Sequence, residues 1–150
     1  MRVFNGLEEV RQAAGTSLGT SDWHEVTQEQ VNLFAEATGD HQWIHVDPER
    51  AAAGPFGAPI AHGFLTLSLI PMLMWQVFSI EGVRMMINYG LNKVRFPAAA
   101  PVGSRVRASV QVVSVADTPH GSQVVMSVTV EREGSDKPVC VAETITLIVP

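Results

Sequence analysis

The spacing of apolar residues changes from helical to strand-like at about residue 82 of the chain. Before that point the apolar positions recur three and four residues apart, which is typical of one face of a helix. Thr27 and Gln30 have the spacing of a capping box, and Gly39 is expected to end the helix that they begin. Asp47 followed by Pro48 predicts a further helix start. Helices are therefore expected over Asn5–Ala14, from Thr27 to Gly39, over Glu49–Ala53 and over Gly63–Phe78.

The segment Gly63–Phe78 is the most apolar of these helices. Its apolar residues occur on all sides, so we expect it to be buried nearly all round. Pro71 lies inside the segment and is expected to bend or cut the helix, because proline has no amide hydrogen to donate.

The second half of the chain alternates between apolar and polar residues, which predicts strands. Turn-rich connections at 117–121 and 134–138 favour an antiparallel meander. Strands are expected over Arg84–Phe96, with a bulge near Gly90, and over Ser104–Val115, Gln123–Glu131 and Val139–Val149, while Ser21–Val26 also alternates. A large antiparallel sheet and a buried helix make an α+β protein, in which the sheet must curl around the helix.

Within these strands the alternation also predicts which side chains form the core. The expected core faces carry Val106, Ala108, Val110 and Val112 in the first strand of the meander, Val124, Met126, Val128 and Val130 in the second, and Val141, Ile145, Leu147 and Val149 in the third.

The composition limits the kinds of protein that this chain can be. With 150 residues, of which 46% are hydrophobic and 17% charged, one domain over residues 1–150 is expected. The net charge of −5 argues against nucleic acid as the main partner, because phosphate binding needs a basic face. The apolar stretch Phe64–Ile80 is shorter than a bilayer span and contains Pro71, so no membrane insertion is expected.

The N-terminal residues and the cysteine content favour a cytoplasmic protein. The first residues lack the continuous apolar run of a secretory signal. The single Cys140 has no partner for an internal disulfide, which fits a reducing compartment, and its place in a strand predicts an inert core thiol.

Two polar loops, over residues 37–48 and 56–65, hold the groups that are capable of catalysis. Asp40 and His45 follow the helix that ends at Gly39, and a carboxylate and an imidazole so placed can hold one water molecule and move its protons. The alternatives are that Asp40 serves only the turn and that His45 is a buried histidine bonded to backbone. His41, His45 and Asp47 also suggest a metal site. The apolar Trp43-Ile44 insert and the lack of a nearby cysteine argue against it, so no metal is expected.

Gly63 begins the apolar helix, where amide hydrogens have no partner within the helix. Such an amide can stabilise a developing oxyanion, although Gly63 can also serve close packing alone. Ser68 is a hydroxyl within the same helix, and its simpler interpretation is a bond to the carbonyl four residues earlier. The chain has no Gly-x-Ser-x-Gly elbow, phosphate-binding loop or dinucleotide glycine fingerprint.

The stretch FAEATGDHQWIHVDP over residues 34–48, followed by IAHGFLTLS over residues 60–68, closely resembles the MaoC-like, R-specific enoyl-CoA hydratase family. The nodulation-protein-N-like branch of that family is the most similar. Arg95-Phe-Pro-Ala and Pro101-Val-Gly103 also resemble the family, and the similarity extends from about Thr20 to the end of the chain.

This resemblance implies a hot-dog fold, in which a curved antiparallel sheet wraps around one long central helix, and it implies a homodimer. The implied reaction is reversible syn addition of water to a trans-2-enoyl thioester of CoA or acyl carrier protein, as in fatty-acid metabolism, with no cofactor. Asp40 and His45 match the catalytic pair, and Gly63 matches the residue whose amide polarises the thioester carbonyl. Ser68 matches a supporting helix serine, and Gln42 stands where many members have asparagine.

One departure concerns Gln42-Trp43, which replaces the family's common Asn-Pro. The glutamine keeps the amide on a longer arm, and the loss of proline frees the backbone of the loop. Two other functions remain open. They are a hot-dog acyl-CoA thioesterase, which would use a carboxylate and an oxyanion-binding helix, and a non-catalytic acyl-binding module.

Overall fold

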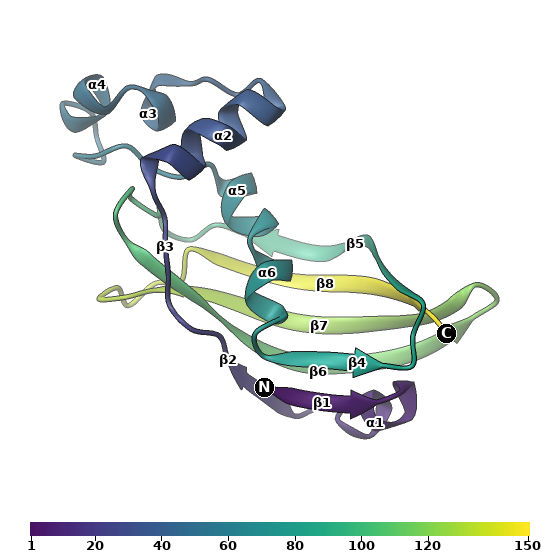
Figure 1. Cartoon of the computed structure of the whole chain (residues 1–150). Helices are drawn as coiled ribbons and strands as arrows, with labels where there is room; N and C mark the ends of the chain where they lie inside the picture. The colour runs from purple at the N-terminus through teal and green to yellow at the C-terminus, as the bar shows by residue number, and fades with distance from the viewer.

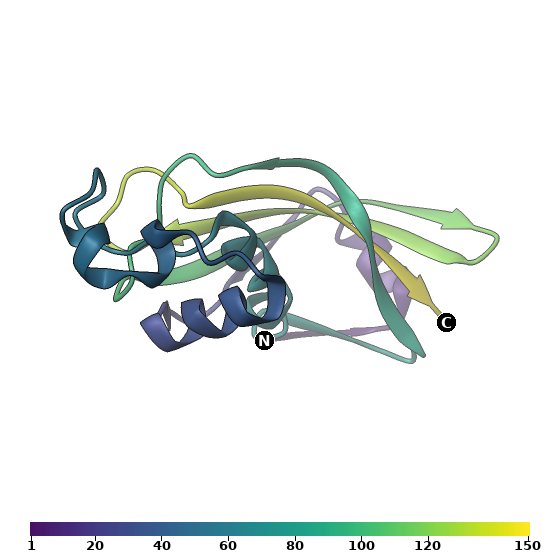
Figure 2. The ribbon, with the colours of Figure 1, turned by 90° about the horizontal axis from the view of Figure 1, so that it is seen from above.

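A curved sheet of six strands forms the body of the protein in the computed structural model, which describes residues 1–150 (Figure 1). The strands lie in the order β2-β6-β7-β8-β5, β3 also pairs with β6, and every pair is antiparallel. The strands are β2 (Ser17–Thr20), β3 (His24–Glu25), β5 (Met85–Arg95), β6 (Arg105–Thr118), β7 (Gly121–Arg132) and β8 (Cys140–Val149). The predicted meander is therefore confirmed, as is the bulge near Gly90, where the pairing of β5 with β8 shifts register. Figure 2 shows the long strands bending along their length.

The predicted core faces are confirmed for β6 and β7, but the prediction for β8 is wrong. In β8 the buried side chains are Cys140, Ala142 and Ile148. Cys140 lies opposite Val130, which is itself buried in β7. Side chains directly opposite each other on neighbouring strands share a face, so the register with β7 decides which half of the β8 pattern points inward.

The apolar helix crosses one face of this sheet as two helices, α5 (Gly63–Ser68) and α6 (Ile70–Met74) (Figure 1). The Leu69 amide still donates to the Leu65 carbonyl and the Leu73 amide to the Leu69 carbonyl, so the chain continues in one direction. The irregularity falls beside Pro71, as expected for a residue without an amide hydrogen. A sheet that curves around this helical segment is the arrangement expected for the hot-dog fold, with the central helix in two pieces.

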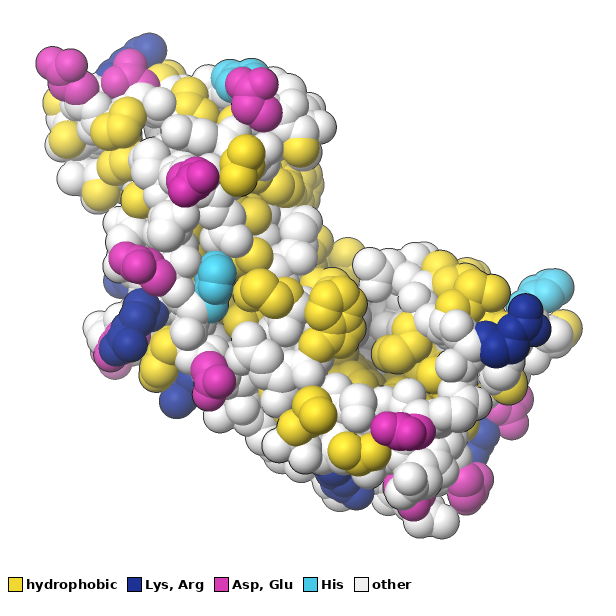
Figure 3. All heavy atoms as spheres, in the orientation of Figure 1, with side chains coloured by type: hydrophobic (Ala, Val, Ile, Leu, Met, Phe, Trp, Pro, Cys, Tyr) yellow, Lys and Arg dark blue, Asp and Glu magenta, His cyan; other side chains and the backbone are white.

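The expectation that this segment is buried nearly all round is wrong for the single chain. Leu65, Leu69 and Leu73 are buried, whereas Phe64 is 69% exposed and Trp75 67%. The sheet covers one side of the helical segment only, and no other element of the chain covers the opposite side. Figure 3 shows hydrophobic side chains gathered on this face of the molecule.

The N-terminal region contains strands that the alternation did not predict. A two-stranded parallel sheet pairs β1 (Arg2–Asn5) with β4 (Phe78–Glu81), and α1 (Leu7–Gln12) follows within the predicted helix. Of the alternating segment Ser21–Val26, only β3 is a strand. These strands are four residues or fewer, and their pairing with distant segments decides their structure.

Three further helices stand at one end of the molecule (Figure 1): α2 (Gln28–Thr38), α3 (Trp43–Val46) and α4 (Pro48–Ala52). The first and third were predicted, and α3 was not.

Of the buried apolar residues, 26 form one core cluster, which includes residues from Phe4 near the N-terminus to Ile148 near the C-terminus. None of the helices combines the length and the apolar composition that crossing a bilayer requires.

Candidate active site

Asp40 lies directly after helix α2, where the chain turns away from the helix axis. Thr27 caps the start of α2, because its Oγ1 accepts a hydrogen bond from the Gln30 amide at 3.2 Å. Gly39 ends the helix in the left-handed conformation (φ 84°), which glycine adopts without steric cost. The Asp40 side chain that follows is exposed, and its Oδ1 accepts a hydrogen bond from the Gln42 amide at 3.3 Å.

His45 lies in the short helix α3, and its side chain is buried. Its Nδ1 lies 2.7 Å from the carbonyl oxygen of Ile60. Because a carbonyl oxygen only accepts, Nδ1 must be the donor, and in the neutral ring Nε2 then carries the lone pair. This is the tautomer that a proton acceptor at Nε2 requires.

The surroundings of His45 favour its neutral form. Burial lowers the pKa of His45 below its usual 6.5, and the neighbouring His62 acts in the same direction. The hydrogen bond to Ile60 and the charge of Asp40 raise the pKa, but they do not outweigh burial. His45 is therefore available as a base at neutral pH.

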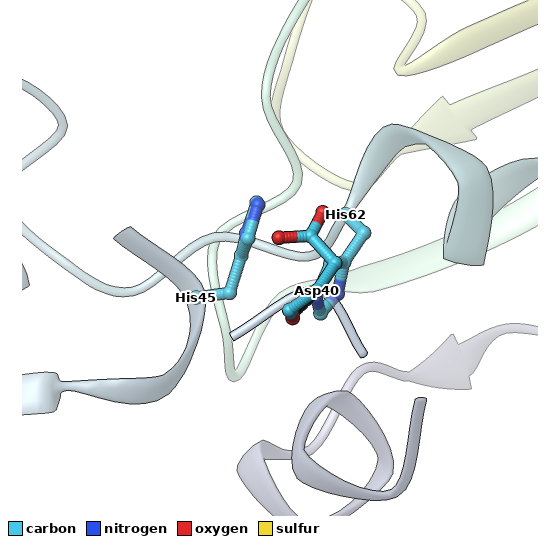
Figure 4. Close-up of side chains that lie close together, drawn as sticks. All are labelled: Asp40, His45 and His62. Atoms are coloured by element: carbon cyan, nitrogen blue, oxygen red, sulfur yellow. Dashed lines mark hydrogen bonds between the residues drawn. The ribbon is translucent and has the colours of Figure 1, made fainter. Parts of the chain in front are cut away.

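Asp40, His45 and His62 form one cluster, in which one nitrogen or oxygen atom of each lies within 4.8 Å of the others (Figure 4). The Asp40 carboxylate points towards the His45 ring. The predicted juxtaposition of Asp40 and His45 is thus present in the structure. The sequence alone assigns no role to His62, although a histidine directly before a helix that is otherwise apolar is a usable signal.

Gly63 follows His62 and is the first residue of α5. It lines a cavity of about 370 Å³ together with Ile60, Thr66 and Phe96. A Cβ atom at Gly63 would lie 3.0 Å from Cδ2 of Phe96, so any side chain here would have to displace the Phe96 ring at this wall of the cavity. Ile60 links this cavity to the catalytic pair, because its carbonyl holds the His45 ring.

Ser68 and Gln42 lie less directly at this cluster. The Ser68 hydroxyl donates to the carbonyl of Phe64 at 2.7 Å, the bond four residues back that the simpler interpretation predicted. Ser68 lines a different cavity of about 520 Å³ between α5, α6, β5 and β8. The Gln42 side chain is exposed, and the residue contributes its amide to Asp40 and its carbonyl to the amide of His45 at 3.0 Å.

The residues considered for a metal site are not brought together as a set. His41 is exposed and lies 3.8 Å from Glu36, and Asp47 accepts a hydrogen bond from the Arg50 amide at 3.1 Å as the cap of α4. Asp40, His45 and His62 are closer, but the two imidazole rings are stacked at 24°. Their in-plane lone pairs therefore point along nearly parallel planes rather than converging on one ion.

Known proteins resemble this chain in sequence over most of its length. Residues 9–134 match the MaoC like domain family. The chain is 62% identical to 3-hydroxyacyl-thioester dehydratase Z of Mycobacterium tuberculosis, over 97% of both chains. It is 45% identical to Nodulation protein N of Rhizobium leguminosarum bv. viciae, over 95% of this chain and 90% of the relative.

Among solved structures, the (R)-hydratase from A. caviae involved in PHA biosynthesis superimposes with a TM-score of 0.72. It is 26% identical, and the match covers 88% of this chain and 96% of the hydratase. The expected hot-dog fold is confirmed by this similarity. Because the family matches residues 9–134 of this chain and a relative aligns with it nearly end to end, the chain belongs to the MaoC-like domain family.

Proposed function

We propose that the chain is an R-specific enoyl-thioester hydratase, which in the reverse direction is a 3-hydroxyacyl-thioester dehydratase. The observation that carries this proposal is the Asp40 carboxylate beside His45, whose free Nε2 lies in the same cluster, next to the start of α5 at Gly63. The names of the dehydratase and hydratase relatives support the same reaction.

In the proposed hydration, Asp40 and His45 hold one water molecule between them. The water oxygen bonds to C3 of the enoyl group, and the electron pair of the C2–C3 double bond moves towards the thioester. The pair takes a proton from the water and returns one to C2 on the same face, which is syn addition. The Gly63 amide donates to the thioester oxygen while negative charge develops there.

The roles of Ser68 and Gln42 are proposed to be indirect. The backbone amide of Gln42 orients the Asp40 carboxylate through its hydrogen bond to Oδ1. The Ser68 hydroxyl is held by its bond to the Phe64 carbonyl, and the residue borders the larger cavity, whose volume of about 520 Å³ is in the range of small-molecule sites.

We also propose that the reaction needs no added cofactor. The thioester itself acidifies C2, and Asp40 and His45 together handle the proton. Turnover that is unchanged after treatment with EDTA supports this proposal, and activity that is restored only by a divalent ion contradicts it.

The protein is proposed to act as a homodimer through strand β5. This strand pairs with β8 on one edge only, and its apolar residues Met86, Tyr89 and Leu91 are exposed. A long apolar edge strand is a favourable site for pairing with another chain. Sedimentation of the double variant Tyr89→Asp/Leu91→Asp should show monomers, whereas Leu33→Asp, at an exposed leucine of α2, should not change the dimer. A native protein that sediments as a monomer contradicts the proposal.

We place the protein in the cytoplasm as one functional domain. Cys140 is a free buried thiol, and a chain without disulfides is common in reducing compartments. Cell fractionation tests the compartment, and limited proteolysis that leaves an active shorter fragment would contradict the single domain.

Incubation with crotonyl-CoA tests the reaction. Loss of the enoyl absorbance without free thiol means hydration, free thiol means a thioesterase, and binding without either change means an acyl-binding module. The same assay with crotonyl-acyl carrier protein distinguishes the two carriers. Conversion of only the R-3-hydroxybutyryl thioester in the reverse direction tests the stereochemistry.

A further inference from the structure

His62 lies directly before helix α5, beside Asp40 and His45, and is buried. Its side chain is 3% exposed. One face of its ring stacks on His45, with the ring centroids 3.9 Å apart. The centroid of the Phe34 ring lies 4.8 Å from that of the His62 ring. Helix α2, helix α3 and the start of α5 therefore meet at His62.

The two nitrogen atoms of His62 have different surroundings. Nε2 lies 2.9 Å from the backbone carbonyl oxygen of Asp40 and must carry the hydrogen of that bond. Nδ1 is buried without any hydrogen-bond partner. A buried acceptor without a partner destabilises a protein, and a phenylalanine would fill the same space without that cost. A histidine retained against this cost is more typical of a functional site than of packing alone.

Asp40 has few other contacts that could fix its backbone. Its amide lies at the limiting distance of 3.5 Å from Thr38 Oγ1, and its carboxylate accepts a bond from the exposed Gln42. The His62 bond is therefore the contact that ties the Asp40 backbone to the buried side of the site. The same ring supports one face of His45.

We propose that His62 is a positioning residue, which fixes the Asp40 backbone by its Nε2 hydrogen bond and the His45 ring by stacking. This inference rests on the proposed hydratase function. A displacement of about 1 Å in a catalytic group can cost about 100-fold in rate, so one side chain that holds both groups has a large influence on turnover.

Three variants separate the two contacts. His62→Leu removes both of them. His62→Phe keeps an aromatic ring but has no donor for Asp40, and His62→Gln keeps a donor, because its amide nitrogen is as many bonds from Cβ as Nε2 is. His24→Phe is the matched control, since His24 also makes one side-chain hydrogen bond through Nε2, to Gln30 at 2.9 Å, away from the site.

We expect the kcat of His62→Leu to fall by about 100-fold, with KM within about threefold of the native value. The kcat of His62→Gln should be about tenfold higher than that of His62→Leu, because the donor to Asp40 is kept. His62→Phe should be as stable as the native protein or more so, because it removes the orphaned Nδ1, and yet its kcat should be low. His24→Phe should keep the native kcat per folded molecule.

A purely structural role makes the opposite prediction for His62→Phe. If that variant turns over at the native rate per folded molecule, the proposal is overturned. A rise in KM alone, with native kcat, also overturns it, because positioning of the catalytic pair acts on kcat.

A readout independent of turnover separates this proposal from the function on which it rests. The NMR signals of the His45 ring should broaden in His62→Leu, because the unsupported ring samples more than one orientation. In His62→Phe the pKa of His45 should rise towards its usual value, because the charge of His62 no longer opposes protonation, while Asp40, the other titratable group beside His45, remains. If the native protein hydrates no enoyl thioester, the proposed function fails, and the NMR result still decides whether His62 positions His45. Unchanged His45 signals in both variants would refute the positioning role.

Discussion

Replacing Gly63 with alanine tests the oxyanion assignment, because it keeps the amide and adds only a methyl group. The added Cβ would lie 3.0 and 3.1 Å from Cδ2 and Cε2 of Phe96, whereas carbon atoms normally approach to about 3.5–4.0 Å. Phe96 is 38% exposed, so its ring has room to move. Both residues line the same cavity, and the methyl group narrows it at the point where the thioester is proposed to bind.

The expected effect on stability is small. Overpacking costs about 1–3 kcal/mol. Gly63 is not among the glycines with positive φ, so alanine fits its backbone, and the better helix propensity of alanine offsets about 1 kcal/mol. A net loss of at most about 2 kcal/mol lowers the Tm of a chain of this size by no more than about 8 °C. If the methyl group holds the thioester away from the Gly63 amide, the loss of that oxyanion contact costs about 3 kcal/mol, or roughly 100-fold in kcat/KM.

The assay measures crotonyl-CoA hydration per folded molecule beside thermal unfolding. The double variant Gly63→Ala/Phe96→Leu is the control. It should restore the Tm, because leucine relieves the contact between the added Cβ and the ring. It should not restore the hydrogen bond to the thioester oxygen. A Gly63→Ala protein that is clearly destabilised but fully active per folded molecule would refute the reasoning and leave Gly63 with a packing role only.

The remaining predictions concern the catalytic pair, pH and the thiol. Asp40→Asn and His45→Gln should each lower kcat by at least ~100-fold while remaining folded by circular dichroism; near-native turnover in either contradicts the mechanism. Because the pKa of folded His45 is lowered, the unfolded chain binds more protons than the folded chain between that pKa and 6.5. The free energy of unfolding should therefore fall as the pH drops through this window, and it should fall less in His45→Gln. Urea unfolding at each pH measures this. Burial raises the pKa of the Cys140 thiol to about 11, so a thiol reagent should label it only after denaturation; rapid labelling of the native protein would show that this part of the core opens.

The parts of the fold that could be predicted from the sequence depend on local chemistry. Thr27 and Gly39 place α2 correctly, because a cap and a left-handed stop act within one turn. Asp47 places α4 for the same reason. The alternation in β6 and β7 identifies the core because each has one clearly apolar face.

The errors arise where a distant partner decides the structure. In β8 both faces carry apolar residues, so only the pairing of Cys140 with Val130 selects the inner one. Strand β1 is short, and it is a strand because it pairs with β4 more than 70 residues away, as in the pairing of Arg2 with Phe78. Phe64 is exposed because the sheet covers only one side of its helix, which no local pattern reports.

The site shows the same division. Asp40 and His45 were predicted because they lie in one loop. His62 was not predicted because its contacts with Asp40 and His45 exist only where the chain path brings residues 60–62 back beside α3. Ser68 has its predicted hydrogen bond, but its place in a separate cavity followed only from the structure.

The segment from Asp40 to Gly63 holds the proposed acid–base pair and the oxyanion donor within a small part of the chain, and contacts at two places close it on itself: His62 with Asp40, and Ile60 with α3. The Ile60 amide donates to the Ile44 carbonyl at 3.0 Å, and the Ile60 carbonyl accepts from His45. Between residues 41 and 59 only His45 and Ala51 are buried, so little apolar contact resists separation of this segment from the sheet. Such a region can open while the rest of the protein stays folded. In rising urea, activity should therefore disappear before the circular dichroism of the sheet changes, and amides of this segment should exchange with solvent faster than those of β6 and β7.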